Sequence, residues 1–160
     1  MEHDNEHLKR QPVLAQPKTQ PATFPTKLPG VIVVIPAYNE ELVIGSLVLK
    51  ASRLVETVIV VNDGSTDTTT HVARLAGAEV IRLAENMGKA HALLAGLNRA
   101  RELGCTAAVT LDGDGQHKTR EIPVVAQPVL EGKADLVIGS RFLGKTNGVP
   151  PHRRVGQKDP

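Results

Sequence analysis

The chain has 160 residues, a formal net charge of +2, three aromatic side chains and a single cysteine, Cys105. Its length fits one domain with one aliphatic core. The small charge and the few aromatic rings argue against a nucleic-acid-binding surface, and one cysteine excludes a disulfide framework or a thiolate metal cluster. No apolar run is long enough to span a bilayer. We therefore expect a cytoplasmic protein that is soluble or associates peripherally with a membrane.

The first 29 residues contain five prolines among polar residues and show no hydrophobic periodicity. Such a segment buries too little apolar surface to offset the entropy of ordering it. We predict a disordered or extended leader over residues 1–29, one domain over 30–144, and a basic tail over 145–160.

Strand and helix patterns alternate after this leader. Continuous aliphatic runs predict buried strands at 31–35, 57–61, 79–83, 106–111 and 135–139. Helices are predicted over 39–54, 67–77, 88–103 and 120–131, the first capped by Asn39 and the last kinked or ended early at Pro128. This alternation predicts an α/β fold with a doubly wound, mainly parallel sheet and flanking helices.

A polar cluster follows each of the five predicted strands, at residues 36–40, 62–67, 85–89, 112–117 and 139–141. Any one of them is also typical of an ordinary turn. Because the carboxyl ends of parallel strands meet at one edge of the sheet, where open α/β folds bind ligands, five clusters together predict a single site.

Asp112 and Asp114 are the chemical centre of this predicted site. Two carboxylates separated by one glycine can converge on Mg²⁺ or Mn²⁺, with Gln116 or His117 as a further ligand or a supporting contact. Such a cation would neutralise a diphosphate leaving group. The alternative is a glycine turn with solvated aspartates. The spacing of the neighbouring glycines does not match an EF-hand, a dinucleotide fingerprint or a Walker loop.

Four further side chains each allow two interpretations. Asp63 can accept a hydrogen bond from the N–H edge of a base or can cap its turn, and Lys89 can contact phosphate or remain solvated. Arg141 can clamp a phosphate or form a surface ion pair. Tyr38 can pack beside the base or fill a gap beneath the loop.

Taken in order, the clusters closely resemble the motifs of the family 2 inverting glycosyltransferases of GT-A fold, over roughly residues 31–158. Within that family the sequence is most similar to the polyprenyl-phosphate (dolichyl-phosphate type) hexose synthases. The resemblance implies transfer of a hexose from a UDP- or GDP-sugar to a polyprenyl phosphate, with inversion and a divalent metal, at the cytoplasmic face of a membrane.

The resemblance also implies a role for each matching position. The donor nucleotide-sugar would be bound by Pro36, Ala37, Tyr38, Glu40, Asp63, Lys89, Asp112 and Asp114. Asp112, Asp114 and Gln116 would hold Mg²⁺ or Mn²⁺, while Asp114 and Arg141 would act in catalysis. In lipid-phosphate synthases the acceptor phosphate is itself the nucleophile, so no dedicated base is needed.

Related enzymes continue beyond the segment that resembles residues 149–158, so we expect this chain to be a truncated, donor-binding half. Its basic end carries Lys145, Arg153, Arg154 and Lys158. These charges would either meet the acceptor phosphate and an anionic membrane surface or form a solvated tail. Two alternative functions are a non-catalytic nucleotide-sugar-binding module and a receiver-like domain with Asp112 as phospho-acceptor.

Overall fold

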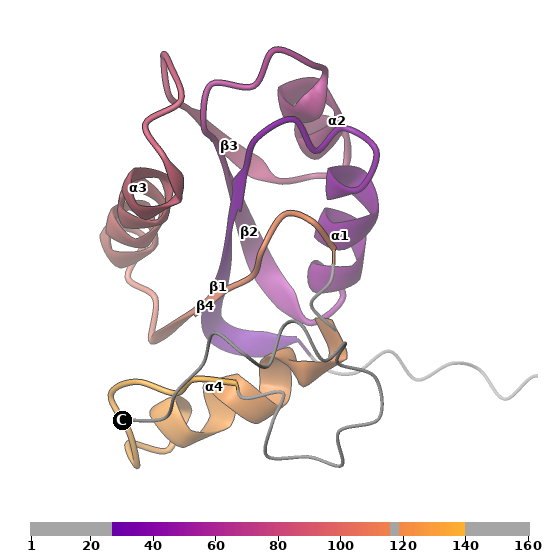
Figure 1. Cartoon of the computed structure of the whole chain (residues 1–160). Helices are drawn as coiled ribbons and strands as arrows, with labels where there is room; N and C mark the ends of the chain where they lie inside the picture. The colour runs from indigo at the N-terminus through magenta and orange to yellow at the C-terminus, as the bar shows by residue number, and fades with distance from the viewer. Residues whose placement is uncertain (1–26, 116–118, 140–160) are drawn as a thin grey trace, which may run out of the picture.

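The computed structural model describes residues 27–115 and 119–139. Four parallel strands form its centre: β1 (Leu28–Ala37), β2 (Val55–Asn62), β3 (Glu79–Arg82) and β4 (Ala107–Thr110). Their order is β3-β2-β1-β4 (Figure 1). The chain therefore moves outward from β1 to β3 and then crosses to the other side of β1. This reversal places the topological switch point at the carboxyl ends of the neighbouring strands β1 and β4, and open α/β sheets bind ligands at such points.

Helices cover both faces of the sheet (Figure 1). On one face lies α3 (Lys89–Glu102); on the other lie α1 (Ile44–Ala51), α2 (Thr69–Leu75) and α4 (Ile122–Leu130), the last preceded by a short 3-10 helix, η1 (Thr119–Glu121). Alternate side chains of β1 enter the two cores, Val33 on the α1 side and Val34 on the α3 side. Because both faces of β1 are buried, its sequence is a continuous aliphatic run.

A single glycine sets how closely α3 approaches the sheet. A Cβ atom at Gly96 would lie 2.3 Å from Cγ1 of Val34 and 3.0 Å from Cγ2 of Val61. Both valines are fully buried, so neither can move aside easily. The absence of a side chain at Gly96 therefore allows α3 to pack this close to the sheet. The first residue of α3, Lys89, lies at the predicted site.

The predicted fold class is confirmed, with helices on both sides of a parallel sheet. The prediction of a fifth strand over 135–139 is wrong, because this segment forms no ladder with the sheet. Leu136 and Ile138 are 77% and 80% exposed, and without pairing or burial an aliphatic run has no reason to remain a strand. β1 also begins at Leu28, inside the stretch predicted as leader.

Two helix boundaries differ from the prediction for local reasons. The first helix begins at Ile44 and not at Asn39, because Asn39 has a left-handed backbone, with φ 54°, and its side chain serves another loop. The helix that was predicted to kink or end early at Pro128 does not end there, and it continues past this proline to Leu130. The carbonyl of Pro128 then accepts the N–H groups of Lys133 and Ala134, which closes the helix end.

Candidate functional site

A pocket of about 320 Å³ opens at the carboxyl ends of β1, β2 and β4, beside the start of α3. Every described residue that the sequence assigned to donor binding lines it: Pro36, Ala37, Tyr38, Glu40, Asp63, Lys89, Asp112 and Asp114. The pocket is also lined by Asn86, Gly88 and Gly113, which belong to the predicted clusters 85–89 and 112–117 but had been assigned no binding role of their own. Gln116, His117 and Arg141 lie outside the described residues. The structure thus brings the described candidates together in one pocket.

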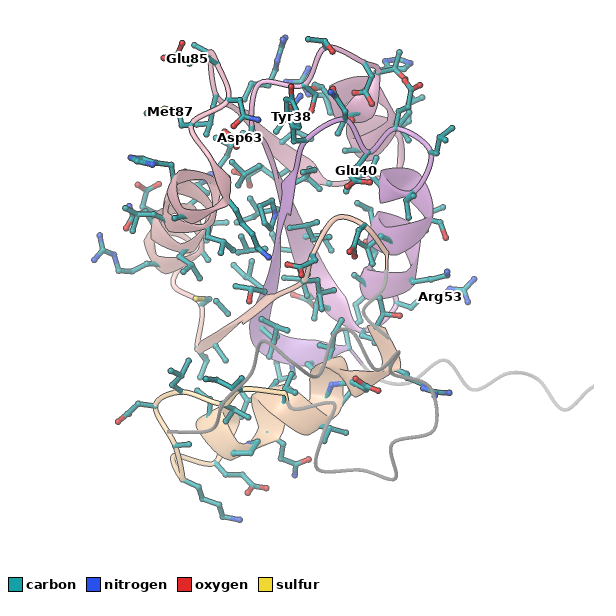
Figure 2. All side chains as sticks on the ribbon, viewed as in Figure 1. Tyr38, Glu40, Arg53, Asp63, Glu85 and Met87 are labelled. Atoms are coloured by element: carbon teal, nitrogen blue, oxygen red, sulfur yellow. The ribbon has the colours of Figure 1, made fainter. Side chains whose placement is uncertain are left out.

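The labelled side chains of Figure 2 show how the loops meet at this end of the molecule. Tyr38 and Glu40 come from the loop after β1, and Asp63 follows β2. Glu85 and Met87 extend from the loop between β3 and α3 on the neighbouring side. Arg53, by contrast, lies away from this cluster, beyond the C-terminal end of α1.

The carboxylate of Asp63 holds the loop between β3 and α3 in place. Its Oδ1 accepts the N–H of Met87 at 2.7 Å, and its Oδ2 accepts the N–H of Gly88 at 2.9 Å. Asp63 is 4% exposed, and backbone donors satisfy both oxygens of its buried side chain. A carboxylate has about four acceptor positions. Asp63 can therefore support this loop and still accept one donor from a ligand.

The loops that follow β1 and β2 are clasped together by hydrogen bonds. The N–H of Glu40 donates to Oγ1 of Thr69 at 2.8 Å, and that hydroxyl donates to the carboxylate of Asp67. In the opposite direction, the carboxylate of Glu41 accepts the N–H and hydroxyl of Thr68 at 2.9 and 2.6 Å. These reciprocal bonds make the two pocket-lining loops one structural unit.

Gly64 allows this unit to approach the loop between β3 and α3. Its φ is +71°, and a Cβ atom there would lie 2.5 Å from the amide nitrogen of Asn86. Beside it, the buried amide of Asn62 accepts the N–H of Ser65 at 2.7 Å and donates to the hydroxyl of Thr70. The sequence predicted residues 62–67 as part of the ligand site but could not predict these contacts, because contacts between loops carry no signal in a local pattern.

The floor of the pocket carries acidic side chains, one of which pairs with the ammonium group of a lysine. Lys89 forms an ion pair with Oδ1 of Asp112, and Asp114 lies two residues further along the same loop. Burial raises the pKa of Glu40, and the negative charges of Asp114 and Asp67 raise it further. The carboxylates gathered at this end of the sheet, Asp112 and Asp114 together with Glu40, place negative charge where a cationic or cation-bound ligand would relieve it.

The carboxylates of this floor fit a divalent cation that arrives with a ligand. Among the described residues, no three His, Cys, Asp or Glu side chains are arranged to form a complete metal cage. Asp112 and Asp114 nevertheless supply the oxygen donors that Mg²⁺ and Mn²⁺ prefer, and such ions are commonly bound by one or two carboxylates plus substrate phosphates. Gly113 keeps the loop close to β1, since its Cβ would lie 2.9 Å from the carbonyl oxygen of Pro36.

Comparison with known proteins agrees with this arrangement. Residues 32–157 match the family model for glycosyl transferase family 2. The chain is 32% identical over 146 residues to the UDP-N-acetylglucosamine–dolichyl-phosphate N-acetylglucosaminyltransferase of Methanococcus voltae, covering 79% of this chain and 58% of that protein. It is 34% identical over 137 residues to the undecaprenyl-phosphate mannosyltransferase of Micrococcus luteus, covering 78% and 54%.

A solved structure extends the likeness to three dimensions. Glucosyl-3-phosphoglycerate synthase of Mycobacterium tuberculosis, in complex with Mn²⁺, UDP-glucose and phosphoglyceric acid, is 31% identical with a TM-score of 0.51. The match covers 64% of this chain and 40% of that one. The chain spans about half the length of the curated relatives it matches, 53% to 58% in three of them.

Proposed function

The chain belongs to glycosyl transferase family 2, and from this premise we propose that it binds a UDP- or GDP-sugar and presents the hexose for transfer, with inversion, to an acceptor phosphate. The observation that carries the proposal is the pocket at the switch point, which joins the loops after β1, β2 and β4 around acidic and basic side chains. The acceptor we propose is a polyprenyl phosphate, because two relatives are named for dolichyl and undecaprenyl phosphate.

Each group of pocket residues has a part in the proposed reaction. The loop after β1, with Tyr38, and the buried Asp63 form the walls for the nucleoside. Asp112, Asp114 and Gln116 would hold Mg²⁺ or Mn²⁺, which when bound offsets the charge that develops on the leaving diphosphate. Arg141 would face the diphosphate or the acceptor phosphate. Because a phosphate oxygen is already an anionic nucleophile, the pocket needs no side chain to remove a proton.

Use of a metal has support from a neighbour of known structure, since glucosyl-3-phosphoglycerate synthase was solved with Mn²⁺ and UDP-glucose. Among the described residues, no helix combines the length and the apolar character needed to cross a membrane. On the basis of the basic residues of the 145–160 segment, Lys145, Arg153, Arg154 and Lys158, we propose peripheral contact with the cytoplasmic face of a membrane.

Calorimetric titration tests the donor site. UDP-glucose, GDP-mannose and UDP-N-acetylglucosamine are titrated in turn, each with Mn²⁺ and with EDTA. We expect one donor to bind only with the metal, and the double variant Asp112→Asn, Asp114→Asn to lose that binding. Asp135→Asn, which removes an exposed carboxylate outside the pocket, is the matched control. Binding by the double variant equal to that of the unaltered chain would contradict the metal role.

A second candidate function is a nucleotide-sugar-binding module without transferase activity. It is favoured by one observation, that the chain spans about half the length of the curated relatives it matches. Incubation of the full chain with the bound donor, Mn²⁺ and a short polyprenyl phosphate separates the two candidates. Formation of a polyprenyl phosphate sugar supports the enzyme, and donor binding without product supports the module.

A further inference from the structure

Asn39 stands between two residues that line the pocket, Tyr38 and Glu40, but does not line the pocket itself. Its φ of 54° makes it the only non-glycine residue with a positive φ in the described part of the chain. Asparagine tolerates this left-handed conformation better than most residues, though it gains nothing from it alone. The conformation turns the chain sharply between the two pocket residues. Contacts with other parts of the chain are therefore needed to keep Asn39 in it.

Hydrogen bonds with the loop after β2 hold Asn39 in this conformation. Its N–H donates to Oγ of Ser65 at 2.9 Å, and its side-chain Oδ1 accepts the N–H of Thr66, also at 2.9 Å. Ser65 is itself fixed, because its N–H donates to the buried side chain of Asn62 at the end of β2. Asn39 is therefore connected to the end of β2 by two successive hydrogen bonds, from Asn39 to Ser65 and from Ser65 to Asn62.

Tyr38 has little else to place it. Its side chain is 47% exposed, and on its N-terminal side the carbonyl of Ala37 accepts the N–H of Asp63 at 2.9 Å. The backbone of Tyr38 is thus fixed by the strand on one side and by Asn39 on the other. Loss of the Asn39 contacts would leave Tyr38 held on that side only through Glu40, whose N–H donates to Thr69, and the exposed ring would add no further support.

We propose that Asn39 is a positioning residue for the donor pocket, whose left-handed backbone and amide oxygen fix Tyr38 at the pocket wall. The inference rests on the proposed function for its consequence, since donor affinity depends on this wall. It acts through its neighbours and touches no ligand. Its first test can be made without any ligand, so the two proposals fail separately.

Tyr38 is the only tyrosine of the chain, which has no tryptophan, so tyrosine fluorescence reports on this loop alone. Three substitutions separate backbone from side chain. Asn39→Asp keeps the acceptor oxygen and tolerates a positive φ, Asn39→Gly keeps only the backbone freedom, and Asn39→Ala keeps neither. Ser65→Ala removes the other bond without altering residue 39. Asn98→Gly, on the exposed face of α3, is the control for general loss of stability.

We expect lower fluorescence anisotropy and stronger quenching of Tyr38 by acrylamide in the Gly, Ala and Ser65→Ala variants, with Asn39→Asp close to the unaltered chain. With donor and Mn²⁺ present, Asn39→Gly should bind roughly threefold to tenfold more weakly, as expected for one lost hydrogen bond. Unchanged anisotropy in Asn39→Gly and Asn39→Ala, or a fall in melting temperature alone as in Asn98→Gly, would overturn the proposal. If the unaltered chain binds no donor, the proposed function fails, and Tyr38 fluorescence still decides the role of Asn39.

Discussion

Lys89, at the first turn of α3, forms an ion pair with Asp112, which follows β4 on the other side of the switch point. Both residues line the pocket, and their side chains are 60% and 41% exposed. An ion pair so open to water contributes little to stability. The charge of Lys89 therefore affects ligand binding more than stability. Its ammonium group lies beside Asp112, in a position for which a divalent cation would compete.

Lys89→Met should raise the affinity of the chain for Mn²⁺ in the absence of any nucleotide. Removal of the ammonium group takes away a positive charge that competes with the metal at Asp112, and the small energy of an exposed pair suggests an increase of about twofold to fivefold. Lys89→Arg, which keeps the positive charge, is the control. The measurement is a calorimetric or spin-resonance titration with Mn²⁺ alone. An affinity in Lys89→Met no higher than in Lys89→Arg would show that the ion pair does not compete with the metal.

Asp67 should make the free energy of unfolding depend on pH. Burial acts to raise the pKa of Asp67, but hydrogen bonds from Thr69 and from the N–H of Glu41 outweigh it and hold the pKa below its ordinary value of 3.8. A pKa lowered in the folded state gives stability that is present above the unfolded pKa and is lost as pH falls through the folded one.

Asp67→Asn should therefore be less stable than the unaltered chain at neutral pH, and the difference should shrink as pH falls below 3.8. Urea denaturation across this range measures it, with Asp135→Asn as the control for loss of an exposed carboxylate. A difference in the free energy of unfolding that stays constant across the range would show that the hydrogen bonds to Asp67 do not favour its charged form.

The sequence was sufficient to predict the sheet, because a strand buried on both faces leaves a continuous aliphatic run such as Val31–Ile35. The same reasoning failed at residues 135–139. This segment contains strand-forming residues such as Leu136 and Ile138, but it pairs with no strand in the described part of the chain. Composition is local, whereas pairing depends on what lies beside the segment.

Positions of the site residues were predictable for a different reason. Parallel strands bring their carboxyl ends to one edge, so Asp63 and Asp112 had to lie near each other once the topology was right. The partners of these residues could not be predicted. Asn39 has the residue type of a helix cap, yet its oxygen accepts the N–H of Thr66, 27 residues along the chain. Such contacts arise only after the two loops have been brought together.

Gly64→Ala should lower both stability and donor affinity. A Cβ atom at this position would lie 2.5 Å from backbone atoms of Glu85 and Asn86, and backbone cannot move aside as a flexible side chain can. The matched control is Gly77→Ala, where φ is +94° but no atom lies within 4 Å of the new Cβ. The control measures the cost of a positive φ alone, so the further loss at Gly64, about 1–3 kcal/mol in the free energy of unfolding, reports the contact between the loops. Equal losses in the two variants would rule out that contact as a source of stability.

Gly96→Ala should destabilise the protein although the same change in a helix usually stabilises it by about 1 kcal/mol. The new methyl group would meet the fully buried side chain of Val34 at 2.3 Å, and a β-branched side chain has few other rotamers to adopt. We expect a loss of about 1–3 kcal/mol, measured by urea denaturation. Asn98→Ala, on the exposed face of the same helix, should instead gain a few tenths of a kcal/mol, since only helix propensity changes there. Because α3 carries Lys89 at its start, its displacement should also weaken donor binding in Gly96→Ala and leave Asn98→Ala unchanged. A gain in stability at Gly96 would mean that α3 can move away from the sheet at little cost, and that this glycine does not determine where Lys89 stands.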